Sequence, residues 1–225
     1  MSIQKISTIE RMIIMKKQQF LAIVAALTMS VAGSAFAAPQ TTFQEGQAQI
    51  DLGAQNVEAE QGHGSTDSKW NFQGGITYGL SDKTAVQYQY SGLKTDINGY
   101  DTTSGHSQEF NVVQSLTPNV AAYAGYNQIK NTYGDSDGPS YTNNVAQIGL
   151  IGKVPIADNL DVYGKIGVGT KDTTTWEAGL SYQATPDLDI NAGYRYLDTQ
   201  GRHDGDDSIT YKGFVTGLSY RFGGQ

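Results

Sequence analysis

The chain has 225 residues, of which 27 are Gly and 14 are Tyr; it is 16% charged, carries a net charge of −7 and contains no Cys. An acidic chain lacks the Lys- and Arg-rich surface that nucleic acid binding requires, so we expect no nucleic acid partner. The absence of Cys excludes disulfide bonds and thiolate sites, and we expect neither a metal nor a cofactor. The mean hydropathy of −0.40 is compatible with a membrane β-barrel, because the strands of such barrels alternate apolar and polar residues.

Residues 1–37 have the pattern of a cleaved export signal. Met15 is followed by two lysines and then by an apolar run from Phe20 to Val31, and small residues surround Ala37. The run has the length of a secretion signal and is too short to cross a bilayer, which disfavours the alternative of a membrane anchor. We predict a start at Met15, cleavage after Ala37, and one folded domain over residues 38–225.

After residue 39 the sequence alternates with a period of two residues, which is the pattern of β-strands. From Trp70 to Leu80, for example, alternate positions are large and apolar, whereas the positions between them are polar or Gly. In the strand that starts at Val120 we take Ala124 and Tyr126 as outward-facing, by analogy with the other strands. The expected strands cover residues 46–57, 69–80, 84–94, 107–116, 120–130, 144–155, 160–170, 174–184, 188–198 and 209–222.

The connections between these strands alternate between two classes. Short turns such as Thr185-Pro186-Asp187 alternate with longer polar connections near residues 58–68, 95–106, 131–143 and 199–208, and with a short one at 171–173. A soluble β-sandwich would also alternate, but strands of roughly 10–11 residues match a tilted bilayer crossing. We therefore predict an all-β, transmembrane, antiparallel up-and-down barrel of about ten strands, with short periplasmic turns and longer external loops.

The last expected strand ends in Gly217-Leu218-Ser219-Tyr220-Arg221-Phe222. This ending resembles the final strand of outer-membrane β-barrel proteins, the family of small porin-like and OmpA- or OmpX-like barrels, although three more residues follow Phe222 here. The resemblance implies a place in the outer membrane, contact with its lipids, and recognition of Leu218, Tyr220 and Phe222 by the barrel-assembly machinery. It implies an architecture and no particular activity.

Polar, charged and small residues occupy the face that we expect to line the barrel interior. Lys165, Glu177, Asp189 and Arg195 fall on three consecutive strands of this face. A hairpin centred near residue 172 puts Lys165 opposite residue 179, two residues from Glu177, and the next turn puts Arg195 opposite Glu177. We therefore expect a Lys165–Glu177–Arg195 cluster at mid-barrel, with Asp189 nearer the periplasmic end. Loss of Glu177 is then expected to lower stability or to open an anion-favouring conductance.

The polar interior allows two interpretations. Buried charges must be paired, so a hydrogen-bonded network that plugs the barrel is one interpretation. Inward glycines leave room for a narrow water-filled path, which is the other. Because about eight strands are filled by side chains and about 16–18 leave an open channel, ten strands lie near the closed end of this range. The sequence thus indicates a structural or small-pore barrel whose loops contact small solutes or surface ligands.

All three histidines, His63, His106 and His203, fall in the expected external connections near several acidic residues. Enzymes of the outer membrane carry His and carboxylates at this rim, so a rim-active lipid or peptide hydrolase is an alternative function, and a surface-adhesion barrel is another. A general base also needs an orienting partner, and no spaced motif joins these residues. We assign no catalytic residue and expect a protein that is not an enzyme.

Overall fold

The computed structural model describes residues 39–62, 64–97, 100–132, 139–202 and 206–224, which belong to one compact unit. The predicted export signal lies outside these residues. Within them, no helix is long and apolar enough to cross a membrane. The strands are β1 (Ala48–Gln61), β2 (Gly64–Ser65), β3 (Lys69–Gly79), β4 (Thr84–Ile97), β5 (Tyr100–Thr117), β6 (Val120–Thr132), β7 (Ser140–Ala157), β8 (Leu160–Gly169), β9 (Thr173–Thr185), β10 (Leu188–Thr199) and β11 (Ile209–Phe222).

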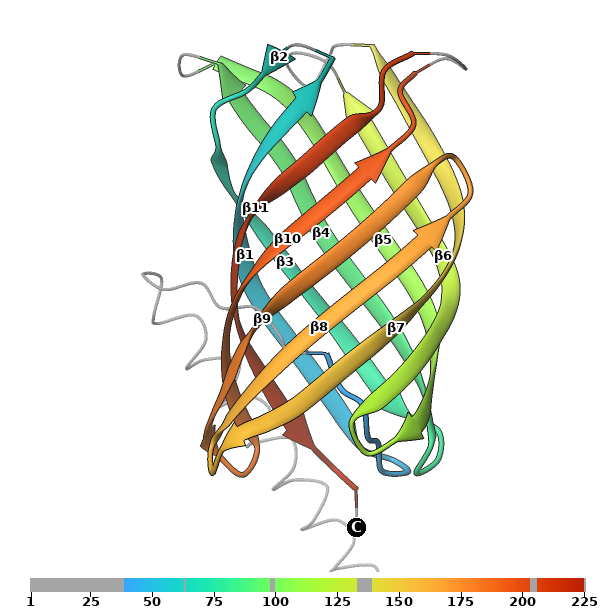
Figure 1. The fold of residues 1–225 in the computed structure, drawn as a ribbon, viewed down its shortest axis with the longest axis vertical. Coiled ribbons are helices and arrows are strands. Elements are labelled where there is room, and N and C mark those ends of the chain that lie inside the picture. Colours follow the sequence, from blue (N-terminus) through green and yellow to red (C-terminus); the bar gives the residue numbers. More distant parts are fainter. Residues whose placement is uncertain (1–38, 63, 98–99, 133–138, 203–205, 225) are drawn as a thin grey trace, which may run out of the picture. The chain divides into compact units, whose positions relative to one another are not determined.

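Ten of these strands form a closed antiparallel barrel (Figure 1). From β3 to β11 each strand pairs with the next one in sequence, and β1 pairs with both β3 and β11. The closing ladder runs from Ala48 opposite Phe222 to Gln61 opposite Ile209. β2 adds only two residues beside the end of β1. The predicted fold class, an up-and-down barrel of ten strands, is confirmed.

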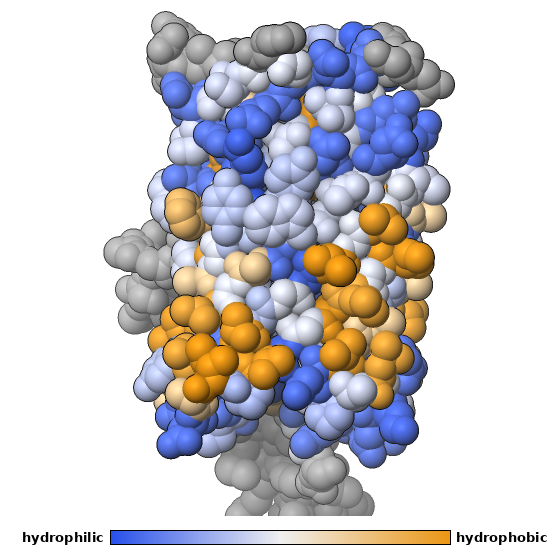
Figure 2. All heavy atoms as spheres, viewed as in Figure 1, coloured by the Kyte–Doolittle hydropathy of each residue, from blue (hydrophilic) through white to orange (hydrophobic). Residues whose placement is uncertain are grey.

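Successive side chains of each strand point alternately outward and inward, as strand geometry requires. On β9, Trp176 and Leu180 are exposed on the outer wall, whereas Glu177 between them is 5% exposed and faces inward. On β6, Ala124 and Tyr126 face outward, as predicted. Figure 2 shows the outer apolar side chains gathered in a band below a hydrophilic upper rim.

The two ends of the barrel differ, and we call them the short-turn end and the loop end. At the short-turn end the connections are residues 80–83, 118–119, 158–159 and 186–187. At the loop end several strands run further than predicted: β4 and β5 pair as far as Ile97 and Tyr100, so most of the connection expected at 95–106 is strand. This extension could not be predicted from the sequence, because the backbone hydrogen bonds between the strands continue beyond the residues that alternate between apolar and polar.

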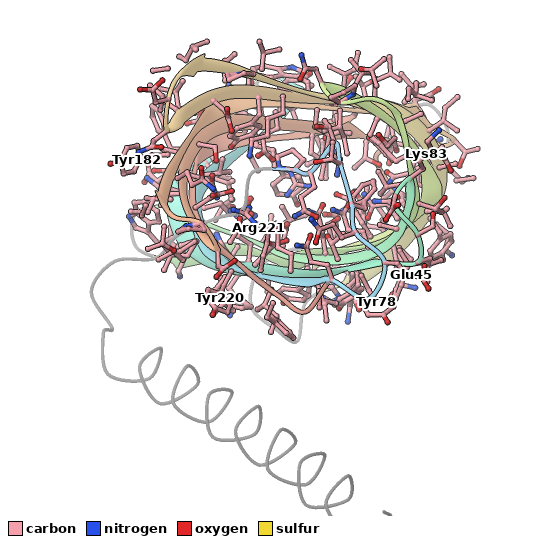
Figure 3. The ribbon with its side chains drawn as sticks, turned by 90° about the horizontal axis from the view of Figure 1, so that it is seen from below. Glu45, Tyr78, Lys83, Tyr182, Tyr220 and Arg221 are labelled. Atoms are coloured by element: carbon pink, nitrogen blue, oxygen red, sulfur yellow. The ribbon has the colours of Figure 1, made fainter. Side chains whose placement is uncertain are left out.

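Residues 39–47, which we call the inserted segment, precede β1 and enter the barrel at the short-turn end. Seen from below, this segment lies within the ring of strands (Figure 3). In the same view Tyr78, Tyr182 and Tyr220 lie outside the ring, and Arg221 lies inside it. The barrel therefore has an aromatic outer rim and a partly covered opening at this end.

Candidate functional site

The interior of the barrel is layered, and β4 shows the order of the layers. From the short-turn end its buried inward residues are Ala85, Gln87, Gln89, Ser91, Leu93 and Thr95, so three polar side chains lie between the apolar Ala85 and Leu93. The short-turn apolar cluster consists of Phe43, Ala85, Val113, Ala121, Tyr123 and Ile151. The loop-end apolar cluster consists of Ala59, Leu93, Ile129, Val145, Leu197, Ile209 and Tyr211. Buried polar side chains also lie on either side of this middle layer, for example Asp51 and Asn191 toward the short-turn end and Asn131 and Thr199 toward the loop end. The predicted polar interior is thus present along the barrel, and the two apolar clusters are additional to it.

Glu109 of β5 is the centre of the middle layer. Its Oε2 lies 2.8 Å from Lys165 Nζ, and its Oε1 lies 2.8 Å from Arg195 Nη2. Lys165 also donates to Gln89 Oε1 at 3.1 Å, and Arg195 Nη1 donates to Ser91 Oγ at 2.7 Å. All three charged side chains are at most 8% exposed. One carboxylate therefore links β5, β8 and β10 through the lumen.

The sequence placed Glu177 at this centre, and the structure differs. The β8–β9 turn is centred at residue 171 instead of 172, so Lys165 lies directly opposite Glu177 in the ladder. Arg195 lies opposite Glu177, at the expected position. The Glu177 carboxylate accepts a hydrogen bond from Tyr163 at 3.1 Å, while both ion pairs go to Glu109. Sequence spacing gives the register of adjacent strands, but Glu109 reaches the two cations from across the lumen.

Asp189 lies in a second network, nearer the short-turn end. Its carboxylate accepts two hydrogen bonds from Arg221, at 2.6 and 2.9 Å. Lys153 Nζ lies 3.6 Å from Asp189 and 3.1 Å from Asp161. Asp189, expected apart from the mid-barrel cluster, is thus tied to β11 and β7, whereas Lys165, Glu177 and Arg195 share the middle layer.

The inward glycines leave less room than their number suggests. Gly149 and Gly167 lie opposite each other on β7 and β8, and Tyr123 packs over both. A Cβ atom at position 167 would lie 2.1 Å from the Tyr123 hydroxyl, and one at position 149 would lie 2.5 Å from its ring. Tyr163 covers Gly179 in the same way. Tyrosine side chains therefore fill the space beside these glycines, which the sequence alone suggests as room for a water-filled path.

The inserted segment is anchored at two points. Thr41 Oγ1 donates to the Pro118 carbonyl oxygen at 2.8 Å, in the turn between β5 and β6. Phe43, only 6% exposed, is part of the short-turn apolar cluster. The segment joins β1 beside the end of β3, where Gly46 N–H donates to the Gly79 carbonyl at 3.0 Å. It thus crosses the opening from the β1–β3 side to the β5–β6 side.

The histidines do not form a site in the described part of the chain. His106 lies in β5, not in a loop, and its ring stacks on Tyr90 of β4 on the outer wall with centroids 5.7 Å apart. His63 and His203 fall outside the described residues. In the ranges that the structure describes, no three His, Cys, Asp or Glu side chains are grouped so that they could hold a metal ion.

Leu218, Tyr220 and Phe222 form one outward row on β11. The strand pairs with β1 at the seam of the barrel, where Phe222 lies opposite Ala48. The rings of Tyr220 and Phe222 stack with centroids 6.3 Å apart. An apolar row therefore lies along the last strand to join the barrel in sequence order.

The sequence profile of the family described as outer membrane protein beta-barrel domain matches residues 23–222. The chain belongs to this family. It is therefore an integral β-barrel of the outer membrane, which agrees with the resemblance seen in the last strand. Family membership fits the closed ring of ten strands and its apolar outer band.

Curated relatives in the family include outer membrane protein P5 of Haemophilus influenzae. One P5 sequence is 26% identical over an alignment of 245 positions, gaps included, which covers 93% of this chain and 62% of the relative. Another is 28% identical over 163 residues, which cover 56% of this chain and 46% of the relative. The chain thus spans about half to three-fifths of the length of the curated relatives it matches.

The chain path is also similar to those of several solved structures. Ail, the attachment invasion locus protein of Yersinia pestis, is 17% identical with a TM-score of 0.42, covering 80% of this chain and 100% of its own. The outer membrane protease OmpT of Escherichia coli is 14% identical with a TM-score of 0.46, covering 78% of this chain and 96% of its own.

Proposed function

We propose that this protein is a structural outer-membrane barrel whose interior is closed to solutes in its resting state. The observation that carries the proposal is the position of Glu109, which holds Lys165 and Arg195 in the middle of the lumen. This charged layer lies between two apolar clusters. A solute that crosses the barrel therefore has to displace side chains at three successive levels.

The middle layer is balanced in formal charge. It contains the two cations, Lys165 and Arg195, and two carboxylates, Glu109 and Glu177. Removing one member of a buried ion pair costs far more than the pair contributes, because an uncompensated charge remains. Such a layer holds its arrangement unless a cation and a carboxylate move together, which supports the closed state.

The size of the barrel also favours a closed interior. Barrels of about eight strands are filled by side chains, and ten strands enclose only a little more space. Tyr123 and Tyr163 take up part of this space over the inward glycines, and Phe43 fills the short-turn end. A small pore, the other interpretation, requires rearrangement of the charged layer.

We infer that the barrel has no catalytic role. A general base needs a hydrogen-bonded partner that orients it, and His106 instead stacks on Tyr90 at the outer wall. The polar strand extensions at the loop end are the surfaces available for external solutes or ligands. In this proposal the loop end faces the outside and the short turns face the periplasm.

Export and assembly use the two ends of the sequence. Residues 1–37 are proposed to direct export and to be removed after Ala37. We propose that the barrel-assembly machinery recognises the outward row of Leu218, Tyr220 and Phe222 before β11 pairs with β1. An apolar row on a strand whose edge is still unpaired supports this role, because unpaired edges bind added strands.

Liposome swelling tests the closed interior. Liposomes that contain the refolded wild-type barrel are transferred to isosmotic solutions of small neutral sugars, with a general porin as the positive control. We expect no swelling above that of protein-free liposomes. A swelling rate that falls with increasing solute size would identify a pore and reject the proposal.

A further inference from the structure

Three basic side chains lie together on the outer wall near the loop end. His106 of β5 is directly opposite Lys130 of β6 and directly opposite Gly92 of β4, two residues before Lys94. Cβ atoms of directly opposed residues lie about 5 Å apart, and those of diagonal neighbours about 7–8 Å. One small anion can therefore contact all three groups.

Carboxylates do not neutralise this group within the part of the chain that the structure describes. Lys212 Nζ lies 2.5 Å from Glu60, and Lys69 Nζ lies 2.8 Å from Asp96. Lys94 and Lys130 are exposed and make no ion pair with a described side chain. In a chain of net charge −7, these two lysines form a local excess of positive charge on the wall.

Toward the membrane, the next outward positions carry amides. Gln108, Gln128 and Asn144 are aligned across β5, β6 and β7. Tyr88 donates its hydroxyl proton to Gln108 Oε1 at 3.1 Å, which leaves the Gln108 amide N–H groups to donate outward. Below them the rings of Tyr88 and Phe110 pack at 4.7 Å, and the apolar band follows.

We propose that Lys94, His106 and Lys130 bind the phosphate of an anionic lipid in the leaflet at the loop end. The order along the wall is basic side chains, amides, aromatic rings and aliphatic side chains. The order along a phosphorylated lipid is phosphate, polar linkage and acyl chain. The amides of Gln108 and Gln128 donate to the oxygens of the linkage, and the chains lie on the rings and the apolar band.

Two features of the wall identify a lipid as the occupant. The basic group is continuous with the lipid-facing band of an outer-membrane barrel, so a lipid headgroup is already at this depth. Its charge is complementary to a phosphate, and basic residues near a membrane surface each strengthen binding of anionic lipid. The proposal does not depend on whether the barrel interior is closed.

The test measures which lipids the full barrel retains. The wild type and the Lys94→Gln/Lys130→Gln variant are placed in nanodiscs of equal parts phosphatidylglycerol and phosphatidylcholine. The barrels are then released from the nanodiscs, and native mass spectrometry identifies and counts the lipids that remain bound to them. We expect the wild type to retain phosphatidylglycerol in excess. Each lysine removed should reduce this excess about 5-fold, which is the effect of about 1 kcal/mol per basic residue at an anionic surface.

A matched control removes the same charge elsewhere. Lys83 and Lys171 are exposed lysines in turns at the two ends of the barrel, and the Lys83→Gln/Lys171→Gln variant should keep the wild-type excess. Inorganic phosphate added to the buffer should not displace phosphatidylglycerol, because it lacks acyl chains. The proposal is overturned by equal retention of both lipids in the wild type, by an unchanged excess in the Lys94→Gln/Lys130→Gln variant, or by displacement with inorganic phosphate.

Discussion

Arg195 and Glu109 are separated by 86 residues in sequence, yet the guanidinium Nη2 lies 2.8 Å from the carboxylate Oε1. Their strands, β10 and β5, are not neighbours in the sheet, so this contact crosses the lumen. Lys165 of β8 binds the other oxygen of the same carboxylate. Glu109 therefore joins opposite walls of the barrel. Its loss would remove the ion pairs that hold β5 to β8 and β5 to β10.

Glu109→Gln should destabilise the folded barrel by about 3–5 kcal/mol, because it leaves two buried cations without their shared carboxylate. Urea unfolding in detergent micelles, followed by tryptophan fluorescence and by the gel mobility of the folded form, measures the loss. Glu177→Gln is the matched control, because Glu177 is also buried in the middle layer but accepts a hydrogen bond from Tyr163. We expect a smaller loss for Glu177→Gln; equal losses would mean that Glu177 shares the two cations, as the sequence suggested.

The sequence predicts contacts between adjacent strands better than contacts across the lumen. The tight turn at Pro186 fixes the β9–β10 register, so Arg195 lies opposite Glu177 as expected. The β8–β9 turn has φ angles of 58° at Lys171 and 48° at Asp172, a left-handed conformation that residue types other than Gly and Asn rarely signal. The centre expected from the sequence therefore lies one residue too late, and the expected partner of Lys165 lies two residues beyond Glu177.

Two further features of the interior cannot be predicted from the alternation of residues along the strands. Glu109 is recognisable as an inward residue, but its partners depend on how the ring closes and how wide it is. Phe43 precedes the first strand and belongs to no alternating series, so its place in the short-turn apolar cluster follows only from the folded chain. Both features depend on the tertiary structure.

Gly167→Ala should destabilise the barrel by about 1–3 kcal/mol, because the new Cβ atom would lie 2.1 Å from the Tyr123 hydroxyl. Adding Tyr123→Phe should recover part of this loss, since that hydroxyl is buried and has no hydrogen-bond partner among the described residues. Gly152→Ala is the control, because the nearest atom to its Cβ would be 3.9 Å away. A thermal-shift series that finds no recovery in the Gly167→Ala/Tyr123→Phe variant would refute the packing described for Tyr123.

Phe43→Ala should release the inserted segment from the short-turn end. Burial of a Phe side chain contributes about 1.5–3 kcal/mol, so the undocked state should become about 10- to 150-fold more populated. The chain has no Cys, and an Ala121→Cys reporter in the same cluster can be labelled with a water-soluble maleimide. Faster labelling is expected with Phe43→Ala but not with Thr42→Ala, which changes an exposed neighbour. Identical labelling rates in the two variants would exclude a covering role for Phe43.

Phe222→Ala should reduce the amount of folded, heat-modifiable barrel in outer-membrane fractions, because it removes the last member of the outward row on β11. Gel mobility of heated and unheated membrane samples measures the folded fraction. Thr216→Ala changes the same outward face further from the row's end and serves as the comparison. Unchanged yield in Phe222→Ala would show that another segment carries the assembly signal.

Single-channel recording in planar bilayers tests the closed interior most directly, with the wild type and Glu109→Gln measured side by side. The wild type should show no steady conductance, because paired charges and apolar clusters fill the lumen. Glu109→Gln should show brief openings that favour anions, because Lys165 and Arg195 then lack the carboxylate that holds them. A steady open channel in the wild type, with the same conductance in Glu109→Gln, would contradict the closed barrel.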